Sequence, residues 1–391
     1  DLYEIIVFAS HECEEYVSVF AGNELMTQGT GGDTDKWRSD SDNVLAQVYT
    51  IKGTPITGIT SFVGPSTWNT SNLSSLAFQN ITFADTNVPD GISFIVVHHH
   101  FDVTNYSQRK QITARIKGKK VRLLTNNTTI GSTPTYSDNP TEIILDFLTD
   151  DNNFNEEDSK IDVESFFTSK TLNDTNSFSC NLAFTANTTL SAAIQELKST
   201  NRSDLIYSQG IWKIKQDEKN KPIEFSITGD DIISGTFAWS QNKARDIANR
   251  VVVSWINPAD QWQTLEASIE NTDLQASDGR VYTKKVQLRG VTNLAQADIF
   301  KELMLNQFRY TEDADGNRID VTPLVVKFTT TIKNSSLEVG DMGTIDYLTE
   351  LPSIKKFVIM SINTKQSGEL ELTLREYALT HYKDTNGNFI I

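Results

Sequence analysis

The pattern of hydrophobic and polar positions predicts a chain built mainly of β-strands, with a few helices between groups of strands. The clearest alternation lies at 369–377, where Leu370, Leu372 and Leu374 alternate with polar residues, as in a half-buried antiparallel strand. The run at 92–97, apolar except for Ser93, is a candidate for a buried strand. Further strands are expected at 3–8, 16–20, 44–63, 92–103, 112–124 with a turn at Gly118, 178–185, 250–256, 281–288, 324–332, 342–347 and 357–362, and a hairpin at 205–216.

Helical spacing appears in fewer places, and one of them carries strong capping signals. Asn139 is a good N-cap, Pro140 suits the first helical position, and Glu142 favours the positive end of the helix dipole. The helix should end in the polar run 150–153. Its expected buried stripe is Ile143, Ile144, Phe147 and Leu148. Other helices are expected at 162–168, at 189–198 with Leu190, Ile194 and Leu197 facing inward, and at 294–309.

These elements group into several small domains. Residues 1–110 form a β-rich region with a large loop or insertion at 29–90, and residues 111–230 form an α+β domain. Residues 231–391 are expected to form a β-barrel-like domain that contains the long helix at 294–309. The predicted fold class is therefore mainly β with α+β insertions.

Composition narrows the function classes. With 391 residues, 38% of them hydrophobic, the chain can bury several cores. A formal net charge of −16 argues against a general nucleic-acid binder or a protein of anionic membranes, because both need clustered Lys and Arg. The start lacks a basic signal-peptide region and already resembles a strand, so we expect a piece of a longer protein. Cys13 and Cys180 are expected to be reduced structural thiols, with one long-range disulfide as the alternative.

Few residues suggest chemistry. His98, His100 and Asp102 would share one face of a strand and are weak candidates for a zinc or iron site, the alternative being a polar strand end. These histidines could instead meet at a threefold interface. No catalytic residue, no cofactor site and no firm metal site is predicted, and the chain is expected not to be an enzyme.

Three further sets of residues have a structural and a functional interpretation. Asp313, Asp315 and Asn317 resemble the start of a calcium loop, but Gly316 comes too early and a solvated turn is preferred; 384–388 is similar. Acidic pairs at 156–158 and 230–231 are expected by chance among 51 acidic residues. Sugar stacking or buried anchoring are the two possibilities for Trp239, Trp255 and Trp262, with anchoring preferred.

A resemblance to a known family begins at Ile112. The segment 112–122, then Tyr136-Ser137-Asp138-Asn139-Pro140 and its helix, resembles the tail-tip hub, or tip attachment protein, family of lambda-like siphophages. The same order continues in the segments 161–166, 188–190, 205–214, 249–258, 288–292 and 337–341. The match covers roughly 92–347. It departs from the family at 150–154, at Val339 in place of a proline, and at 29–90, which resembles nothing in the family.

The resemblance implies a structural hub with tube-like β-barrel domains, three copies of which surround the tail axis in the virion at the tail tip. The implied partners are the distal tail protein, the tail tube, the tape measure protein and other tip or fibre proteins, with DNA passing through the channel without specific recognition. Synthesis in the host bacterial cytoplasm and a role in host attachment and genome ejection are also implied. The receptor-binding portion would lie outside this chain. A carbohydrate-binding adhesin and a cell-wall hydrolase are the alternatives.

Overall fold

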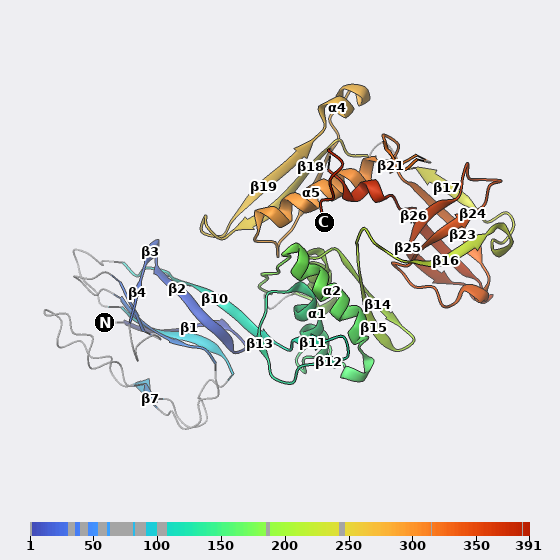
Figure 1. Cartoon of the computed structure of the whole chain (residues 1–391). Coiled ribbons are helices and arrows are strands. Elements are labelled where there is room, and N and C mark those ends of the chain that lie inside the picture. Colours follow the sequence, from blue (N-terminus) through green and yellow to red (C-terminus); the bar gives the residue numbers. More distant parts are fainter. Residues whose placement is uncertain are drawn as a thin grey trace. The chain divides into compact units, whose positions relative to one another are not determined.

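The computed structural model describes residues 2–29, 36–39, 46–53, 61–62, 81–82, 91–99, 108–184, 188–241, 247–313, 315–384 and 386–391. The chain forms two compact units, 1–121 with 133–137, and 122–132 with 138–391 (Figure 1). The fold is mainly β, as predicted. The division into three domains stays a prediction.

The first unit consists of two sheets around one core. One has the order β1-β9-β6-β5-β4 and the other β13-β10-β2-β3. Buried residues from both sheets, such as Val19, Val48 and Val97, share one core. The strands are β1 (Leu2–Ala9), β2 (Cys13–Ala21), β3 (Glu24–Leu25), β4 (Thr27–Gln28), β5 (Lys36–Arg38), β6 (Ala46–Ile51), β9 (Ser93–His99), β10 (Ile112–Val121) and β13 (Thr135–Tyr136), with a separate pair β7 (Ser61–Phe62) and β8 (Ile81–Thr82).

Two predictions about this unit have clear outcomes. Residues 93–97 of β9 are buried, as the apolar run predicted, and His98 and His99 are buried as well. The turn predicted at Gly118 is wrong, because β10 passes straight through that glycine. Its neighbours Lys117 and Lys119 pair with Glu15 and Cys13 of β2, and this cross-strand pairing overrides the local tendency of glycine to break a strand.

The second unit begins with an α+β part. Its elements are β11 (Leu124–Asn126), β12 (Thr129–Ile130), α1 (Pro140–Thr149), η2 (Asp158–Lys160), α2 (Val163–Asn176), α3 (Leu190–Ser199), β14 (Ser203–Ser208) and β15 (Ile211–Gln216). Asn139 caps α1 as predicted, since its side chain accepts a hydrogen bond from the Thr141 amide. The β14–β15 hairpin also forms as predicted, with Gln209 and Gly210 both at positive φ.

Three predictions in this part are wrong or incomplete. The helix predicted at 162–168 continues to Asn176, because Asn173 and neighbouring polar residues bond to α1 and β15 and so extend the packed face. Leu190, predicted to face inward, is exposed at the first position of α3. Residues 178–184 are not a strand; Phe178 and Cys180 are buried side chains on an extended segment whose amides bond to other loops.

The middle of this unit is a three-stranded sheet covered by the long helix. The sheet order is β19-β18-β20, and the elements are β18 (Arg250–Asn257), β19 (Gln263–Glu270), α4 (Thr272–Asp278), β20 (Thr283–Gln287) and α5 (Leu294–Arg309). Trp255 and Phe300 lie in its core. The long helix was predicted with its correct bounds.

The remaining strands form a six-stranded, half-closed barrel with the order β16-β24-β25-β26-β23-β17 (Figure 1). Its strands are β16 (Ile223–Thr228), β17 (Ala238–Gln241), β23 (Leu324–Thr330), β24 (Met342–Asp346), β25 (Lys355–Thr364) and β26 (Leu370–Glu376), accompanied by η3 (Gly229–Asp231), η5 (Ile332–Asn334), η6 (Leu379–Tyr382) and the pair β21 (Thr311–Glu312) and β22 (Arg318–Ile319). Leu370, Leu372 and Leu374 are buried, as the alternation predicted. No helix among the described residues is long and apolar enough to cross a bilayer.

Candidate functional site

The histidine set proposed for metal is only partly described. His98 is buried in β9, while His100 and Asp102 lie outside the described residues. Within the described part of the chain, no group of three or more His, Cys, Asp or Glu residues is placed to hold a metal ion. The metal site at these three residues therefore stays an untested prediction.

The neighbouring His99 takes part in a polar cluster that the sequence did not single out. It points to the opposite side of the strand from His98, and its Nε2 lies 3.3 Å from the Glu4 carboxylate, which also pairs with Arg109. Burial lowers the pKa of His99, although the Glu4 hydrogen bond and charge oppose this shift. His99 shares a face of β9 with the buried Ile95 and Val97, a position that strand geometry assigns to it once the strand is known.

The two calcium-like turns use their first aspartate internally. The Asp313 carboxylate accepts hydrogen bonds from the backbone amides of Asp315 and Asn317, and the Asp384 carboxylate does the same for Asn386 and Asn388. Each aspartate therefore stabilises its own exposed turn.

The acidic pairs also have local roles. Asp158 pairs with Arg122, and the Asp231 carboxylate accepts hydrogen bonds from the amide and hydroxyl of Thr228. The Ser159 hydroxyl donates to Glu157 at 3.1 Å, so carboxylates of both sets take part in local contacts.

The three tryptophans separate into one buried and two exposed side chains. Trp255 belongs to the core between β18 and α5, as the anchoring interpretation predicted. Trp239 is 52% exposed on β17 and Trp262 is 43% exposed at the β18–β19 turn. In that turn both Gln261 and Trp262 adopt positive φ, a conformation that non-glycine residues rarely take.

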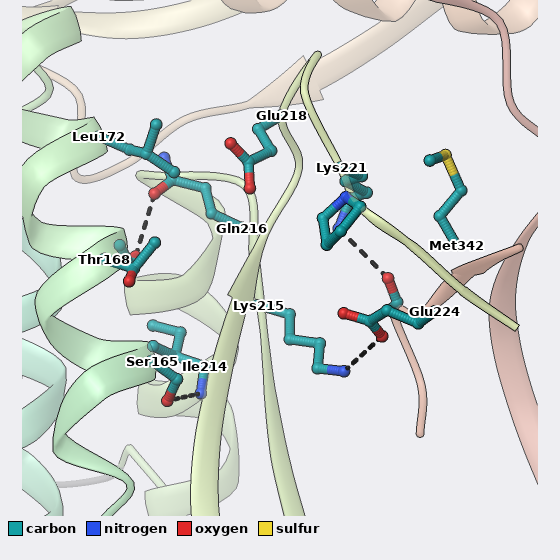
Figure 2. A pocket seen from close by; sticks show the side chains of 13 residues that line it. Ser165, Thr168, Leu172, Ile214, Lys215, Gln216, Glu218, Lys221, Glu224 and Met342 are labelled. Carbon is teal, nitrogen blue, oxygen red and sulfur yellow. Dashed lines mark hydrogen bonds and ion pairs between the residues drawn. The ribbon is translucent and has the colours of Figure 1, made fainter. Parts of the chain in front are cut away.

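A cavity of about 220 Å³ lies in the second unit between α2, β15 and the start of β16 (Figure 2). The connection 217–222 and the residues before β24 complete its wall. Its lining residues are Ser165, Thr168, Ser169, Leu172, Ile214, Lys215, Gln216, Glu218, Lys221, Pro222, Glu224, Gly340 and Met342. We take this cavity and the charged residues at its rim as the candidate site.

Hydroxyl and amide groups fix the α2 wall of the cavity. Ser165 Oγ accepts a hydrogen bond from the Ile214 amide at 3.2 Å, and the Ser169 hydroxyl donates to Gln216 Oε1 at 3.0 Å. Gln216 in turn donates to Asn173 Oδ1 at 2.9 Å. Because these polar groups are satisfied by each other, α2 and β15 form a preformed wall.

The opposite rim carries a cluster of lysines and carboxylates. Lys215 Nζ pairs closely with Asp341 and lies 3.3 Å from Glu224 and 3.5 Å from Glu338. Lys213 Nζ lies 2.8 Å from the same Glu338 (Figure 2 labels Lys215 and Glu224). The cluster therefore joins the β14–β15 hairpin to the beginnings of β16 and β24.

The pKa shifts of the residues in this cluster differ in direction and cause. Burial disfavours the Lys215 ammonium, but the hydrogen bond and charge of Asp341, with Glu224 and Glu338, raise the pKa of Lys215. Burial opposes ionisation of Glu338 as well, yet Lys213 and Lys215 lower its pKa. Glu224 differs, because burial and the neighbouring Asp341 raise its pKa to about 7 despite Lys215. Burial also raises the pKa of Glu218.

The backbone at 337–341 explains why this sequence can build the cluster. Gly340 has φ +85, and a Cβ at this position would lie 3.3 Å from the Lys215 side chain. Asp341 Oδ2 accepts a hydrogen bond from the Glu338 amide at 2.8 Å, which closes the turn. A glycine followed by an aspartate thus allows the turn and supplies the partner of Lys215.

A second polar network lies where the connection leaves β15. The Asp217 carboxylate accepts hydrogen bonds from Arg202, from Gln307 Nε2 at 2.8 Å and from the Tyr382 hydroxyl at 2.5 Å. Burial opposes ionisation of Asp217, but the Arg202 charge and the Tyr382 hydrogen bond hold its pKa well below the usual range. This network ties the α+β part to α5 and η6. No sequence motif predicted it, because its members are distant along the chain.

Both clusters join elements of the second unit that are distant along the chain. The chain matches no protein-family model and no curated protein by sequence. Among solved structures it is similar to a chain of the virion of a native gene transfer agent particle, with a TM-score of 0.49 and 13% identity over 98% of this chain and 89% of that one. It is also similar to prophage tail protein gp18 from Listeria monocytogenes EGD-e, with a TM-score of 0.28 and 10% identity over 51% of this chain and 55% of that one. Identities and TM-scores this low do not establish a shared function.

Proposed function

We propose that this chain is a structural component of a bacteriophage tail, and specifically a hub of the tail tip. The observation that supports the proposal is the order of the segments that resemble the tip attachment family. They fall on successive elements: β10, α1, α2, the start of α3, the β14–β15 hairpin, β18, the approach to α5 and the turn before β24.

The roles of the motif residues fit a structural protein. Asn139 caps α1 and donates to Asp174 of α2 at 2.8 Å. Asn249 accepts from the Tyr282 amide at 2.8 Å and donates to the Arg280 carbonyl at 2.8 Å, which joins β18 to the segment before β20. These motif residues therefore hold elements of the chain together.

In the proposed role, the chain forms a homotrimer on the tail axis. It docks on the distal tail protein and the end of the tail tube, lines or closes the channel, and carries the central fibre or receptor-binding parts. Its function is assembly and transmission of receptor engagement to genome ejection, without catalysis.

Electron microscopy of phage particles that contain the chain tests this proposal. A tag or antibody on the chain should mark the distal end of the tail, and reconstruction of that end should place the chain with threefold symmetry below the tube. Label along the tail shaft or on the head would contradict the tip assignment. A chain that stays monomeric in solution and in the particle would contradict the hub role.

An adhesin that binds carbohydrate is the second candidate, because Trp239 exposes half of its side chain on β17. Aromatic faces of this kind can stack on sugars. In that case the purified protein binds defined glycans in an array, and Trp239→Ala abolishes binding without changing the thermal midpoint. A lack of glycan binding by the wild-type protein removes this candidate.

A further inference from the structure

The carboxylates of Glu224, Glu338 and Asp341 at the rim of the cavity outnumber the two lysines that pair with them there. Lys213 pairs with Glu338, and Lys215 pairs most closely with Asp341. Glu224 is then a third carboxylate, 3.3 Å from an ammonium that already has a partner. Because like charges held close together cannot all ionise freely, one proton is expected to remain in this cluster.

The backbone at Glu224 departs from regular strand pairing. β16 pairs with β24 in parallel, and its register shifts between Ile223 and Phe225, so Glu224 lies at a bulge. A bulge interrupts the ladder and turns a side chain toward a new direction. Here the bulged residue is the one whose carboxylate lies beside Lys215, at the end of the connection 217–222 (Figure 2).

The surroundings leave room for this segment to move. The cavity of about 220 Å³ lies directly behind Glu224, bounded by uncharged α2 side chains. The start of the connection is anchored, because Asp217 accepts hydrogen bonds from Arg202 and Tyr382, and the Lys219 carbonyl accepts one from the Tyr377 hydroxyl. Nearer to Glu224, Lys221 donates a hydrogen bond to the Gly340 carbonyl at 3.2 Å. Glu224 itself is the most exposed of the three carboxylates, at 37%, against 11% for Glu338 and 7% for Asp341.

We propose that Glu224, Asp341 and Lys215 form a proton-sensitive latch between the β14–β15 hairpin and the half-closed barrel. In the closed latch, Glu224 is protonated and lies beside Asp341 and Lys215. Loss of that proton leaves two neighbouring carboxylates for one lysine, so the Glu224 side chain turns to solvent. The start of β16 then loosens together with the adjoining residues 220–222, whereas Asp217 stays anchored.

The other charged groups that face the latch influence the pH range in which it opens. Glu338 and Lys213 neutralise each other next to Lys215, whereas Glu218 and Lys221 face the cavity from the connection. The raised pKa of Glu224, about 7, sets the expected opening near neutral pH. A carboxyl group with a raised pKa favours the closed state at low pH, and this preference disappears as the pH rises through that pKa. The latch does not depend on the proposed role in a tail.

Hydrogen–deuterium exchange of the intact chain between pH 5.5 and 8.5, corrected for intrinsic exchange rates, tests the latch. In the wild type, the protection of backbone amides in 217–226 should fall by about tenfold across this range. Proton linkage would allow a larger fall for a fully buried carboxyl group, but solvent screens Glu224. Peptides from 250–270 serve as the internal reference and should change less.

Glu224→Gln is the decisive variant, because an amide imitates the protonated carboxyl group. We expect it to keep 217–226 protected at pH 8.5 as well as at pH 5.5. The matched control is Glu266→Gln, which removes a carboxylate that pairs with Lys285 on an exposed sheet face and should leave the wild-type pH dependence intact. Trypsin cleavage after Lys219 at a fixed pH of about 8 gives an independent readout, several times slower in Glu224→Gln than in the wild type.

Two results would overturn the proposal. One is wild-type protection of 217–226 that does not change with pH relative to the reference peptides. The other is a pH dependence that persists in Glu224→Gln, since the latch would then not involve this carboxyl group.

Discussion

Replacing Asp217 by alanine should destabilise the second unit strongly, because Asp217 is the common acceptor of three buried donors. The Arg202 side chain is 12% exposed and the Tyr382 side chain is almost fully buried, so neither can turn to water when the carboxylate is removed. Breaking a buried ion pair from one side typically costs about 3–5 kcal/mol. We expect Asp217→Ala to lower the free energy of unfolding by an amount in that range.

A double variant separates the cost of the stranded charge from the cost of lost packing. Arg202→Met with Asp217→Ala removes both charges and keeps a side chain of similar length. It should cost only about 1–3 kcal/mol, mainly from the unsatisfied hydroxyl of Tyr382 and amide of Gln307. The double variant should therefore be more stable than Asp217→Ala alone.

Thermal and urea unfolding, followed by tryptophan fluorescence near pH 7, measure these differences. Asp230→Ala is the control, since Asp230 is exposed and a surface substitution usually changes stability by no more than about 0.5 kcal/mol. The reasoning is refuted if Asp217→Ala unfolds like the control. It is also refuted if the costs of the two single substitutions add up in the double variant, because the pair would then not be coupled.

Three further predictions concern packing, protonation and thiol chemistry. In Gly343→Ala the new methyl group would overlap the Phe225 ring where β16 approaches β24, and a fall in the thermal midpoint equivalent to about 1–3 kcal/mol should follow. Burial lowers the pKa of His381 to about 4, so the folded state binds fewer protons than the unfolded chain. Up to about 3 kcal/mol of stability should therefore be lost as the pH falls from 6.5 to 4. His381→Gln should flatten that part of a curve of unfolding free energy against pH. Burial raises the pKa of both Cys13 and Cys180, the latter to about 12. A thiol reagent should therefore label them only after denaturant is added. Rapid labelling of the native protein would contradict this burial.

Local sequence patterns were sufficient to predict the elements whose buried positions or caps follow a regular spacing. The alternation at 369–377 predicted β26 with its buried leucines, and Asn139-Pro140 predicted where α1 begins. The spacing of apolar residues at 294–309 predicted α5 with its correct bounds. In each case the preference of the segment agrees with the environment in which it is buried, so local information decided the outcome.

Contacts between distant segments decided the remainder. Gly118 stays within a strand because its neighbours Lys117 and Lys119 pair with β2. Asn173 stays in α2 because β15 and α1 satisfy its side chain. The latch shows this most clearly. Lys215, Glu224 and Asp341 are unremarkable charges in the sequence, and only the return of the chain from β16 to the turn before β24 brings them within ion-pair distance. The sequence by itself determined the strands, the caps and the mainly β class; the tertiary structure decided which charges meet, because electrostatic coupling depends on distances that no local pattern encodes.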